Sequence, residues 1–326
     1  MVYRKKIIFY LILGLLIRVI IMPFFTHWDL PAIYEMSHYF SYHHIFDIYS
    51  VVYNYNHWSA DFPPLVFYTF GGYLWLIKWL MPLFDSFKHF QFNSLYYPGW
   101  VTSIQAFRYL FLLKIPYLIF DIFIGFALTH FFLDKDKKIK IFTLWMLNPV
   151  SLYITYMFGQ FDVIPTALVI LSLLLVKKGK ISWSFLILGL AIAFKNYPLF
   201  FILPALIICG GNFWKVVKNF FLSIFPYFLS ILPFIGNLTF RDPVLLNSRI
   251  TSYFFKSEIT IGQGDSLVPF FIIYSLVIFY FLTKRLKKIN ILNNLIFSYT
   301  IILLLFFSFI YFHPQWILWL LPFLVD

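Results

Sequence analysis

The sequence predicts an all-α, polytopic integral membrane protein. Hydrophobic residues make up 62% of the 326 residues and charged residues only 12%, and the mean hydropathy is +0.84. A single soluble core cannot hide that much apolar surface. Apolar runs follow one another along the chain, separated by short basic segments. Because a bilayer core of about 30 Å needs roughly 20 apolar residues per helix, we expect one membrane domain, residues 1–326, with about 9 to 11 transmembrane helices.

The basic segments predict the orientation in the membrane. Sixteen of the 25 Lys and Arg residues lie in five clusters at the ends of apolar runs, namely residues 4–6, 135–140, 177–180, 215–218 and 284–288. Clusters of this kind remain on the cytoplasmic side. We therefore expect a cytoplasmic N-terminus. The net charge of +12 then reflects orientation in the membrane rather than nucleic-acid binding.

If each apolar run crosses the membrane, the basic clusters should all lie on the cytoplasmic side, and this rule fails once, near the N-terminus. Three apolar runs, at residues 7–25, 65–84 and 107–132, would leave the basic cluster at 135–140 outside. The run at 65–84 is the weakest candidate for a crossing, because it contains Lys78 and a Gly pair and follows two prolines. We expect it to lie in the outer interface, or to re-enter the membrane packed on protein.

The chain then divides into an outward module at residues 26–106 and a transmembrane bundle at 107–326. The module lies between the first and second crossing helices. A second outward loop at 236–266 is long and polar, as expected of a binding loop or lid. Only about ten residues follow the His-Pro-Gln-Trp sequence at 313–316, too few to span a membrane, so we expect a longer C-terminal part.

Two carboxylates of the outward module are the strongest candidates for catalysis. Asp29 and Asp61 each lie among aromatic and apolar residues with few neighbouring charges. Asp121 lies within an apolar run, seven residues after Lys114, so the two would share a helix face and pair structurally. Asp162 is expected to cap the start of a helix.

Three cations lie within apolar runs: Arg18, Lys114 and Lys195. A charge at membrane depth costs about 2.5 to 3.5 kcal/mol on insertion scales, so these residues need partners or a function. An anionic lipid phosphate at the outer leaflet would satisfy them. Snorkelling toward the interface is the alternative, chiefly for Arg18. The module's histidines lack a spaced set of carboxylates, so we predict no metal site.

Short motifs along the chain resemble those of GT-C membrane glycosyltransferases. The segments 27–29 (His-Trp-Asp) and 61–65 (Asp-Phe-Pro-Pro-Leu) resemble the H-x-D and D-Y-P-P-L pair of dolichyl-phosphate-glucose-dependent glucosyltransferases. A further set of motifs in this chain is similar to the signatures of prokaryotic polyprenyl-phosphate-mannose transferases. These motifs are Lys114 with Asp121, Asn148-Pro149, Gly159-Gln160-Phe161-Asp162 and His313-Pro314-Gln315-Trp316. One departure is that His27 stands where an acidic residue is frequent.

This resemblance implies an inverting glycosyltransferase of the prokaryotic cell membrane, acting on the outer face. The donor would be a polyprenyl or dolichyl monophosphate sugar, with mannose expected, and the acceptor a lipid-linked glycan, a glycolipid or a protein. Asp29 would be the general base and Asp61 a second catalytic residue. No cofactor is implied, and help from a divalent cation is left open. The residues expected to bind substrates are His27, Lys114, Gln160, Asp162, Lys195, Arg249, His313 and Gln315.

A transporter or lipid flippase is the main alternative, because such a protein would also place buried charges along the route of its substrate through the membrane. Transport predicts charges through the membrane midplane and internal repeats. Here the unexplained charges gather on one face and no repeat is visible. A membrane acyltransferase is a third possibility, but His130 has no partner motif. The absence of a Gly-rich phosphate loop favours a lipid-linked donor over a nucleotide sugar.

Overall fold

The computed structural model is helical throughout except for one hairpin, in the parts that it describes. The hairpin pairs β1 (Ile259–Gly262) with β2 (Asp265–Leu267) in antiparallel register, at the end of the second outward loop. The all-α membrane class is confirmed. The residues described are 2–27, 29–56, 61–81, 104–246, 252–253, 256–262, 264–284 and 290–324.

The helices fall into an N-terminal group and a larger bundle. The N-terminal group consists of α1 (Val2–Ile21), α2 (Asp29–His43), α3 (Ile48–Asn56) and α4 (Pro64–Ile77). The bundle consists of α6 (Ile104–Leu113), α7 (Ile115–Thr129), α8 (Lys135–Met146), α9 (Pro149–Leu152), α10 (Val163–Lys177), α11 (Ile181–Phe194), α12 (Leu199–Cys209), α13 (Phe213–Ile231), α14 (Leu238–Phe240), α16 (Pro269–Lys284) and α17 (Ile291–Phe309). A π-helical turn (Tyr153–Phe158) follows α9, and 3₁₀ turns (Pro314–Trp319 and Leu321–Phe323) follow α17.

Fewer described helices are long enough to cross a membrane than the nine to eleven expected. Three segments qualify by length and composition, Lys135–Phe158, Phe213–Phe234 and Ile291–Phe309, and the bent pair α6–α7 makes a fourth. Several apolar runs are instead divided into shorter helices. Helices α10, α11 and α12 have 15, 14 and 11 residues. At 1.5 Å per residue they extend only roughly 16 to 23 Å.

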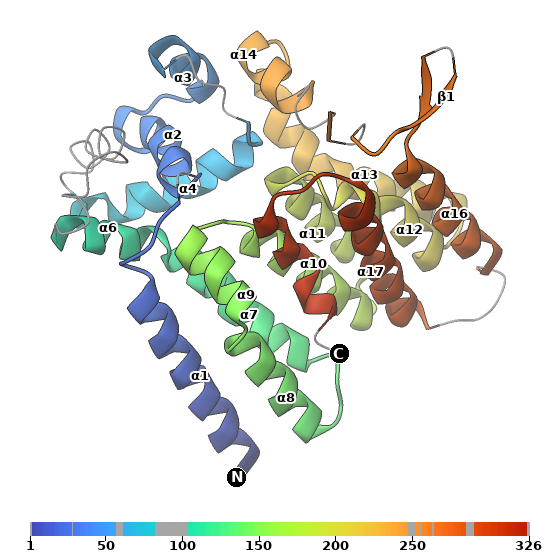
Figure 1. Cartoon of the computed structure of the whole chain (residues 1–326), viewed down its shortest axis with the longest axis horizontal. Helices are drawn as coiled ribbons and strands as arrows, with labels where there is room; N and C mark the ends of the chain where they lie inside the picture. Colours follow the sequence, from blue (N-terminus) through green and yellow to red (C-terminus); the bar gives the residue numbers. More distant parts are fainter. Residues whose placement is uncertain are drawn as a thin grey trace.

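The two segments predicted to face outward lie at the same end of the molecule. Helix α1 rises from the N-terminus at the lower edge of Figure 1, and α8 also begins there. Helices α2, α3 and α14 and the hairpin lie at the upper edge. The side chain of Asn237, before α14, donates to Asp47 Oδ1 over 3.1 Å and to Ser50 Oγ over 2.9 Å, which fastens the second loop to α3.

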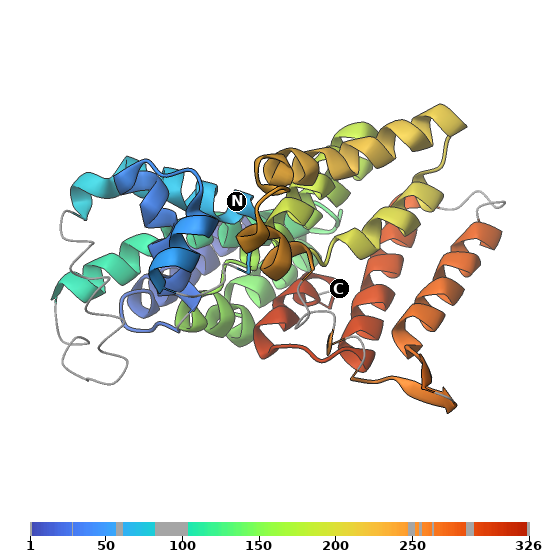
Figure 2. The ribbon, with the colours of Figure 1, turned by 90° about the horizontal axis from the view of Figure 1, so that it is seen from above.

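Helix α4 lies across the upper end of α1 rather than beside it (Figures 1 and 2). It has 14 residues, which at 1.5 Å per residue is about 21 Å and too short for a bilayer core of about 30 Å. The structure describes this run as far as Met81, and for that part the short helix supports the expectation that the run at 65–84 does not cross the membrane.

A proline divides α6 from α7, which meet at an angle of 42°. Pro116 has no N–H to donate to the carbonyl of Leu112, so the helix cannot continue unbroken. Two tyrosines satisfy the freed carbonyls. Tyr73 of α4 donates to Leu112 O over 2.7 Å, and Tyr34 of α2 donates to Leu113 O over 2.5 Å. Burial raises the pKa of the Tyr34 phenol, which keeps it a donor. The bend therefore anchors α2 and α4 of the outward module.

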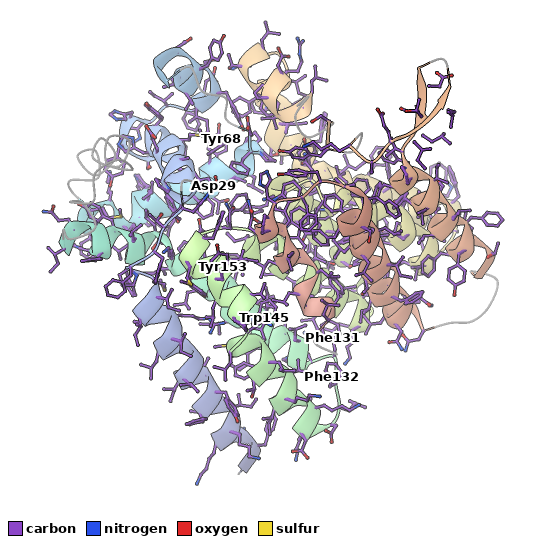
Figure 3. The ribbon with its side chains drawn as sticks, in the orientation of Figure 1. Asp29, Tyr68, Phe131, Phe132, Trp145 and Tyr153 are labelled. Atoms are coloured by element: carbon purple, nitrogen blue, oxygen red, sulfur yellow. The ribbon has the colours of Figure 1, made fainter. Side chains whose placement is uncertain are left out.

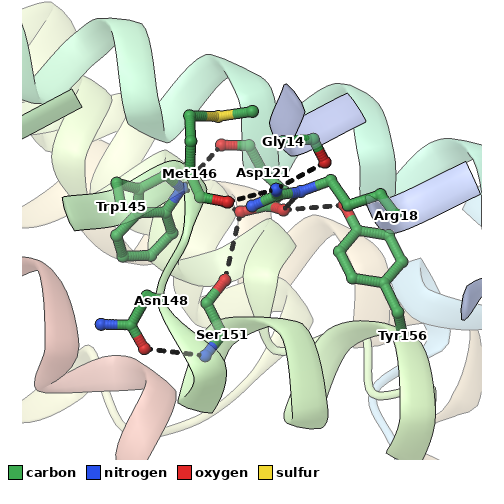
Figure 4. A network of polar contacts seen from close by, with 8 residues as sticks. All are labelled: Gly14, Arg18, Asp121, Trp145, Met146, Asn148, Ser151 and Tyr156. Atoms are coloured by element: carbon green, nitrogen blue, oxygen red, sulfur yellow. Dashed lines mark hydrogen bonds and ion pairs between the residues drawn. The ribbon is translucent and has the colours of Figure 1, made fainter. Parts of the chain in front are cut away.

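A buried ion pair joins α1 to α7. Arg18 Nε donates to Asp121 Oδ2 over 2.7 Å, and both side chains are fully buried. Tyr156 and Trp145 also donate to this carboxylate, over 2.7 and 2.8 Å, and Ser151 Oγ lies 3.4 Å away (Figure 4). The prediction that Asp121 pairs structurally is therefore right in kind, but wrong in its partner.

Lys114 is held elsewhere because the helix bends at this residue, so Lys114 and Asp121 do not share a helix face. Its ammonium donates to the carbonyls of Met22 over 2.8 Å and Tyr156 over 2.7 Å, and to that of Phe25. Its three hydrogens are thus used by the segment that follows α1 and by the π-helical turn. The structure gives Lys114 a structural role, and we do not include it among the proposed substrate ligands.

Candidate active site

Asp29 begins α2, a position in the first helical turn that suits an acidic residue. In Figure 3 it lies in the upper half of the molecule, between Tyr68 and Tyr153. Gln160 Nε2 donates to its Oδ2, and His27 Nδ1 lies 3.8 Å from the same oxygen. The Asp29 side chain is 28% exposed. The carboxylate is therefore oriented by neighbours yet accessible to a substrate.

The turn that carries Gln160 depends on Gly159. The π-helical turn ends there with φ +79°, a left-handed conformation that costs glycine little. A Cβ on Gly159 would lie 3.1 Å from the Cβ of Leu30 in α2. Glycine therefore allows the turn to approach α2 closely enough for Gln160 to reach Asp29.

Gly159→Ala should destabilise the fold by about 1 to 2 kcal/mol, because a left-handed backbone is costly for alanine and the new methyl presses on Leu30. By loosening the contact between Gln160 and Asp29, it should also lower the glycosyl transfer that the sequence motifs predict. Unfolding in detergent and a transfer assay measure the two effects. Gly236→Ala is the matched control, since an added Cβ there meets open space. Identical behaviour of the two variants would contradict this account of the turn.

The same turn holds His27. The imidazole stacks on the ring of Phe158, with centroids 3.8 Å apart and planes 19° from parallel. The backbone N–H of Asp29 donates to His27 Nδ1 over 3.4 Å. His27 therefore contributes to the placement of Asp29, and with 44% of its side chain exposed it remains available to a substrate.

Asp162 forms a second, buried charge centre two residues after Gln160. Its carboxylate oxygens lie 2.9 and 3.0 Å from Lys195 Nζ. Trp319 Nε1 donates to Oδ1 over 2.5 Å. The side chain makes no capping hydrogen bond to α10, so the prediction that Asp162 acts as a helix cap is wrong. Its partners come from distant parts of the chain.

Four aromatic rings surround the ammonium of Lys195. Nζ lies 5.1 to 5.8 Å from their centroids, close enough for cation–π attraction. Phe62 follows Asp61 in the outward module, Phe161 belongs to the Gln160 turn, and Trp316 and Trp319 come from the C-terminal segment. Lys195 therefore lies where these three segments meet.

The remaining predicted residues lie at the edge of this centre or outside the description. The ring of His313 lies 5.4 Å from that of Trp316. Gln315 is buried, and its Oε1 has no hydrogen-bond partner among the residues described. Asp61 is half-buried beside Phe62. Arg249 lies outside the described residues, so its predicted role stays a prediction.

Sequence reasoning missed Trp319. Its indole stacks on Trp316, with centroids 5.1 Å apart, and on Tyr197, with centroids 4.1 Å apart. The spacing of three residues between the tryptophans was an available signal, because side chains three apart align on a 3₁₀ turn.

In the described part of the chain, no group of three or more His, Cys, Asp or Glu residues is placed to hold a metal ion.

Comparisons with known proteins identify the class of enzyme. The model of glycosyltransferase family 87 matches residues 95–260, just over half of the chain. GPI mannosyltransferase 1 of Dictyostelium discoideum is 25% identical over 162 residues, which cover 44% of this chain and 36% of that protein. The match thus spans about a third of the relative's length. No solved structure matched the chain.

The family match decides between the alternatives drawn from the sequence. The matched residues include the Gln160 turn, Asp162 and Lys195. The expected GT-C type of membrane glycosyltransferase is confirmed, and this finding displaces the transporter and acyltransferase alternatives. The chain belongs to glycosyltransferase family 87.

Proposed function

We propose that the enzyme transfers a hexose, with mannose as the expected sugar, from a polyprenyl or dolichyl monophosphate to an acceptor hydroxyl. The acceptor is a lipid-linked glycan, a glycolipid or a protein on the outer face of a prokaryotic membrane. One observation carries this proposal. Gln160 binds Asp29, and Asp162, two residues later, binds Lys195, so a candidate base and a candidate cation share one site.

Asp29 acts as the general base. As the acceptor oxygen attacks C1 of the sugar, Asp29 takes the hydroxyl proton, and the bond from C1 to the phosphate oxygen breaks with its electron pair on the lipid phosphate. One displacement of this kind inverts the anomeric centre. Because Gln160 occupies Oδ2, we assign the acceptor proton to Oδ1. A placed base contributes roughly 10²- to 10⁴-fold to such a step.

The leaving lipid phosphate gains charge, so fixed donors near it stabilise the transition state. Lys195 directs two hydrogens to Asp162, which leaves one for the phosphate or for the bridging oxygen. His313 lies next along the aromatic segment, beyond Trp316. Gln315 is assigned to a sugar hydroxyl, because its Oε1 has no hydrogen-bond donor among the described residues. Asp61 is kept as a second carboxylate on the acceptor side.

The choice of donor rests on two supports. The sequence has no Gly-rich loop of the kind that cradles the phosphates of nucleotides. The relative in Dictyostelium is described as a mannosyltransferase, which supports mannose. We assign no step to a metal ion.

The donor can be tested directly. Purified full chain in lipid nanodiscs is given radiolabelled polyprenyl-phosphate mannose, polyprenyl-phosphate glucose or GDP-mannose, with a host lipid extract as acceptor, once with added Mg²⁺ and once with excess EDTA. We expect label to move from the polyprenyl-phosphate mannose in both reactions. Transfer from GDP-mannose alone would overturn the proposed donor, and transfer that occurs only with Mg²⁺ would overturn the assignment of no step to a metal ion. The same assay in sealed vesicles of known orientation tests the outward face.

A further inference from the structure

The pair formed by Lys195 and Asp162 is close to neutral. Asp162 is fully buried, and both its carboxylate oxygens lie within 3.0 Å of the Lys195 ammonium. Lys195 can donate a hydrogen bond, but its positive charge is already balanced. A lipid phosphate that leaves without its sugar carries additional negative charge. A donor site therefore needs another cation that is not already paired.

Lys256 meets this requirement. Its ammonium lies 3.9 Å from the ring centroid of Tyr311 and 5.4 Å from that of Tyr253. The side chain is exposed, and it forms no ion pair with any carboxylate in the described part of the chain. Aromatic faces hold a cation in place without neutralising it. The positive charge of Lys256 is thus fixed in position but available.

The segment that carries Lys256 is fastened to the chain that leaves α17. The hydroxyl of Ser257 donates to the carbonyl of Phe309. The backbone N–H of Tyr311 donates to the carbonyl of Tyr253 over 3.5 Å, a long contact. Residues 309–311 lie just before His313. Lys256 is therefore held against the segment that carries the histidine already assigned to the donor phosphate.

A continuous series of ring contacts links Lys256 to the buried charge pair. The hydroxyl of Tyr253 lies 3.4 Å from Nε2 of His313, whose ring is 5.4 Å from that of Trp316. Trp316 stacks on Trp319, which donates to Asp162. Rings that are apolar with a polar edge suit the boundary between lipid and water. The series is a ready surface for a molecule with an apolar tail and an anionic head.

We propose that Lys256, together with His313, binds the phosphate of the lipid-linked donor. This inference rests on the proposed lipid phosphate donor. Lys256 supplies the unpaired positive charge, and His313 supplies a directed contact. Lys195 then lies toward the sugar and the bridging oxygen, nearer to Asp29. The chain gives no local sequence signal for this role, since Lys256 is one of several charges in a polar loop.

Binding of lipids without a sugar tests this directly. Undecaprenyl monophosphate and undecaprenol are titrated into the full chain in nanodiscs, with tryptophan fluorescence as the readout. Lys256→Gln should weaken phosphate binding roughly tenfold, as expected for loss of a charge-assisted contact, and leave alcohol binding unchanged. Lys256→Arg should restore the affinity. Lys78→Gln is the matched control, because Lys78 also lies over an aromatic ring, that of Trp75, at 5.9 Å.

The outcomes separate this inference from the proposed function. If wild type prefers the phosphate and Lys256→Gln keeps that preference, the role of Lys256 is wrong and the lipid phosphate donor stands. Equal losses for phosphate and alcohol would also overturn the inference, because they would indicate a disturbed segment rather than a lost charge. If wild type does not distinguish phosphate from alcohol, the lipid phosphate donor fails, and this inference fails with it.

Discussion

Asp29→Asn should lower kcat for glycosyl transfer by about 10²- to 10⁴-fold, the usual contribution of a positioned base. Asparagine keeps the size of the side chain and an oxygen that can accept from Gln160, so the turn should stay in place. It cannot take the acceptor proton. Binding of undecaprenyl monophosphate should therefore be unchanged. Initial rates at saturating donor and acceptor, with lipid titrations on the same samples, measure both quantities.

A carboxylate away from the site serves as the control for this variant. Asp242 is exposed in the second outward loop, where its carboxylate lies 3.3 Å from Nε of its neighbour Arg241, so Asp242→Asn should transfer sugar at the wild-type rate. If Asp29→Asn is as active as Asp242→Asn, Asp29 is not the base. If Asp61→Asn is the variant that loses transfer, the base is the other candidate carboxylate.

Asp121→Asn should reduce the free energy of unfolding by about 3 to 5 kcal/mol, because it leaves Arg18 as an uncompensated charge in a fully buried position. The double variant Arg18→Met with Asp121→Leu removes both charges and should be markedly more stable than either single variant. Denaturation in mixed detergent micelles measures these differences. Asp136→Asn, at the exposed start of α8, is the matched control.

Loss of the ion pair between Arg18 and Asp121 should also disturb the active site. Tyr156 donates to Asp121 through its hydroxyl, and its carbonyl accepts from Lys114. Gln160 follows four residues later and contacts Asp29. The network therefore fixes the turn that orients the base, and Asp121→Asn should lower transfer in protein that remains folded. Wild-type stability in Asp121→Asn would contradict the assigned role of the pair.

The sequence was sufficient to predict the membrane class and the grouping of several motifs, because both depend on local patterns. Apolar runs and basic clusters identify membrane helices wherever they pack. The cost of a charge in an apolar run showed that Arg18, Lys114 and Lys195 need partners, and the structure provides partners for all three. Asp29, Gln160 and Asp162 were selected from short motifs and Lys195 as a charge in an apolar run, and the structure brings them together.

The identity of the partners could not be predicted, because it depends on tertiary placement. Lys114 and Asp121 have the spacing of a shared helix face, but Pro116 breaks that helix, and Arg18 comes from α1. The presence of Pro116 between the two residues already indicated that this helix could break. Asp162 stands at a helix start, yet its side chain turns to Lys195 and Trp319, which are distant in the chain. No local sequence pattern predicts the role of Lys256, because its position is set by contacts with residues after α17.

The rate of the chemical step tests the central claim most directly. Enzyme loaded with radiolabelled polyprenyl-phosphate mannose is mixed with acceptor, and one turnover is followed by rapid quenching. We predict that Asp29→Asn loads the donor as wild type does but completes this turnover about 10²- to 10⁴-fold more slowly, because an amide cannot accept the acceptor proton. An Asp29→Asn enzyme with the wild-type rate in this single turnover would show that another group takes the proton.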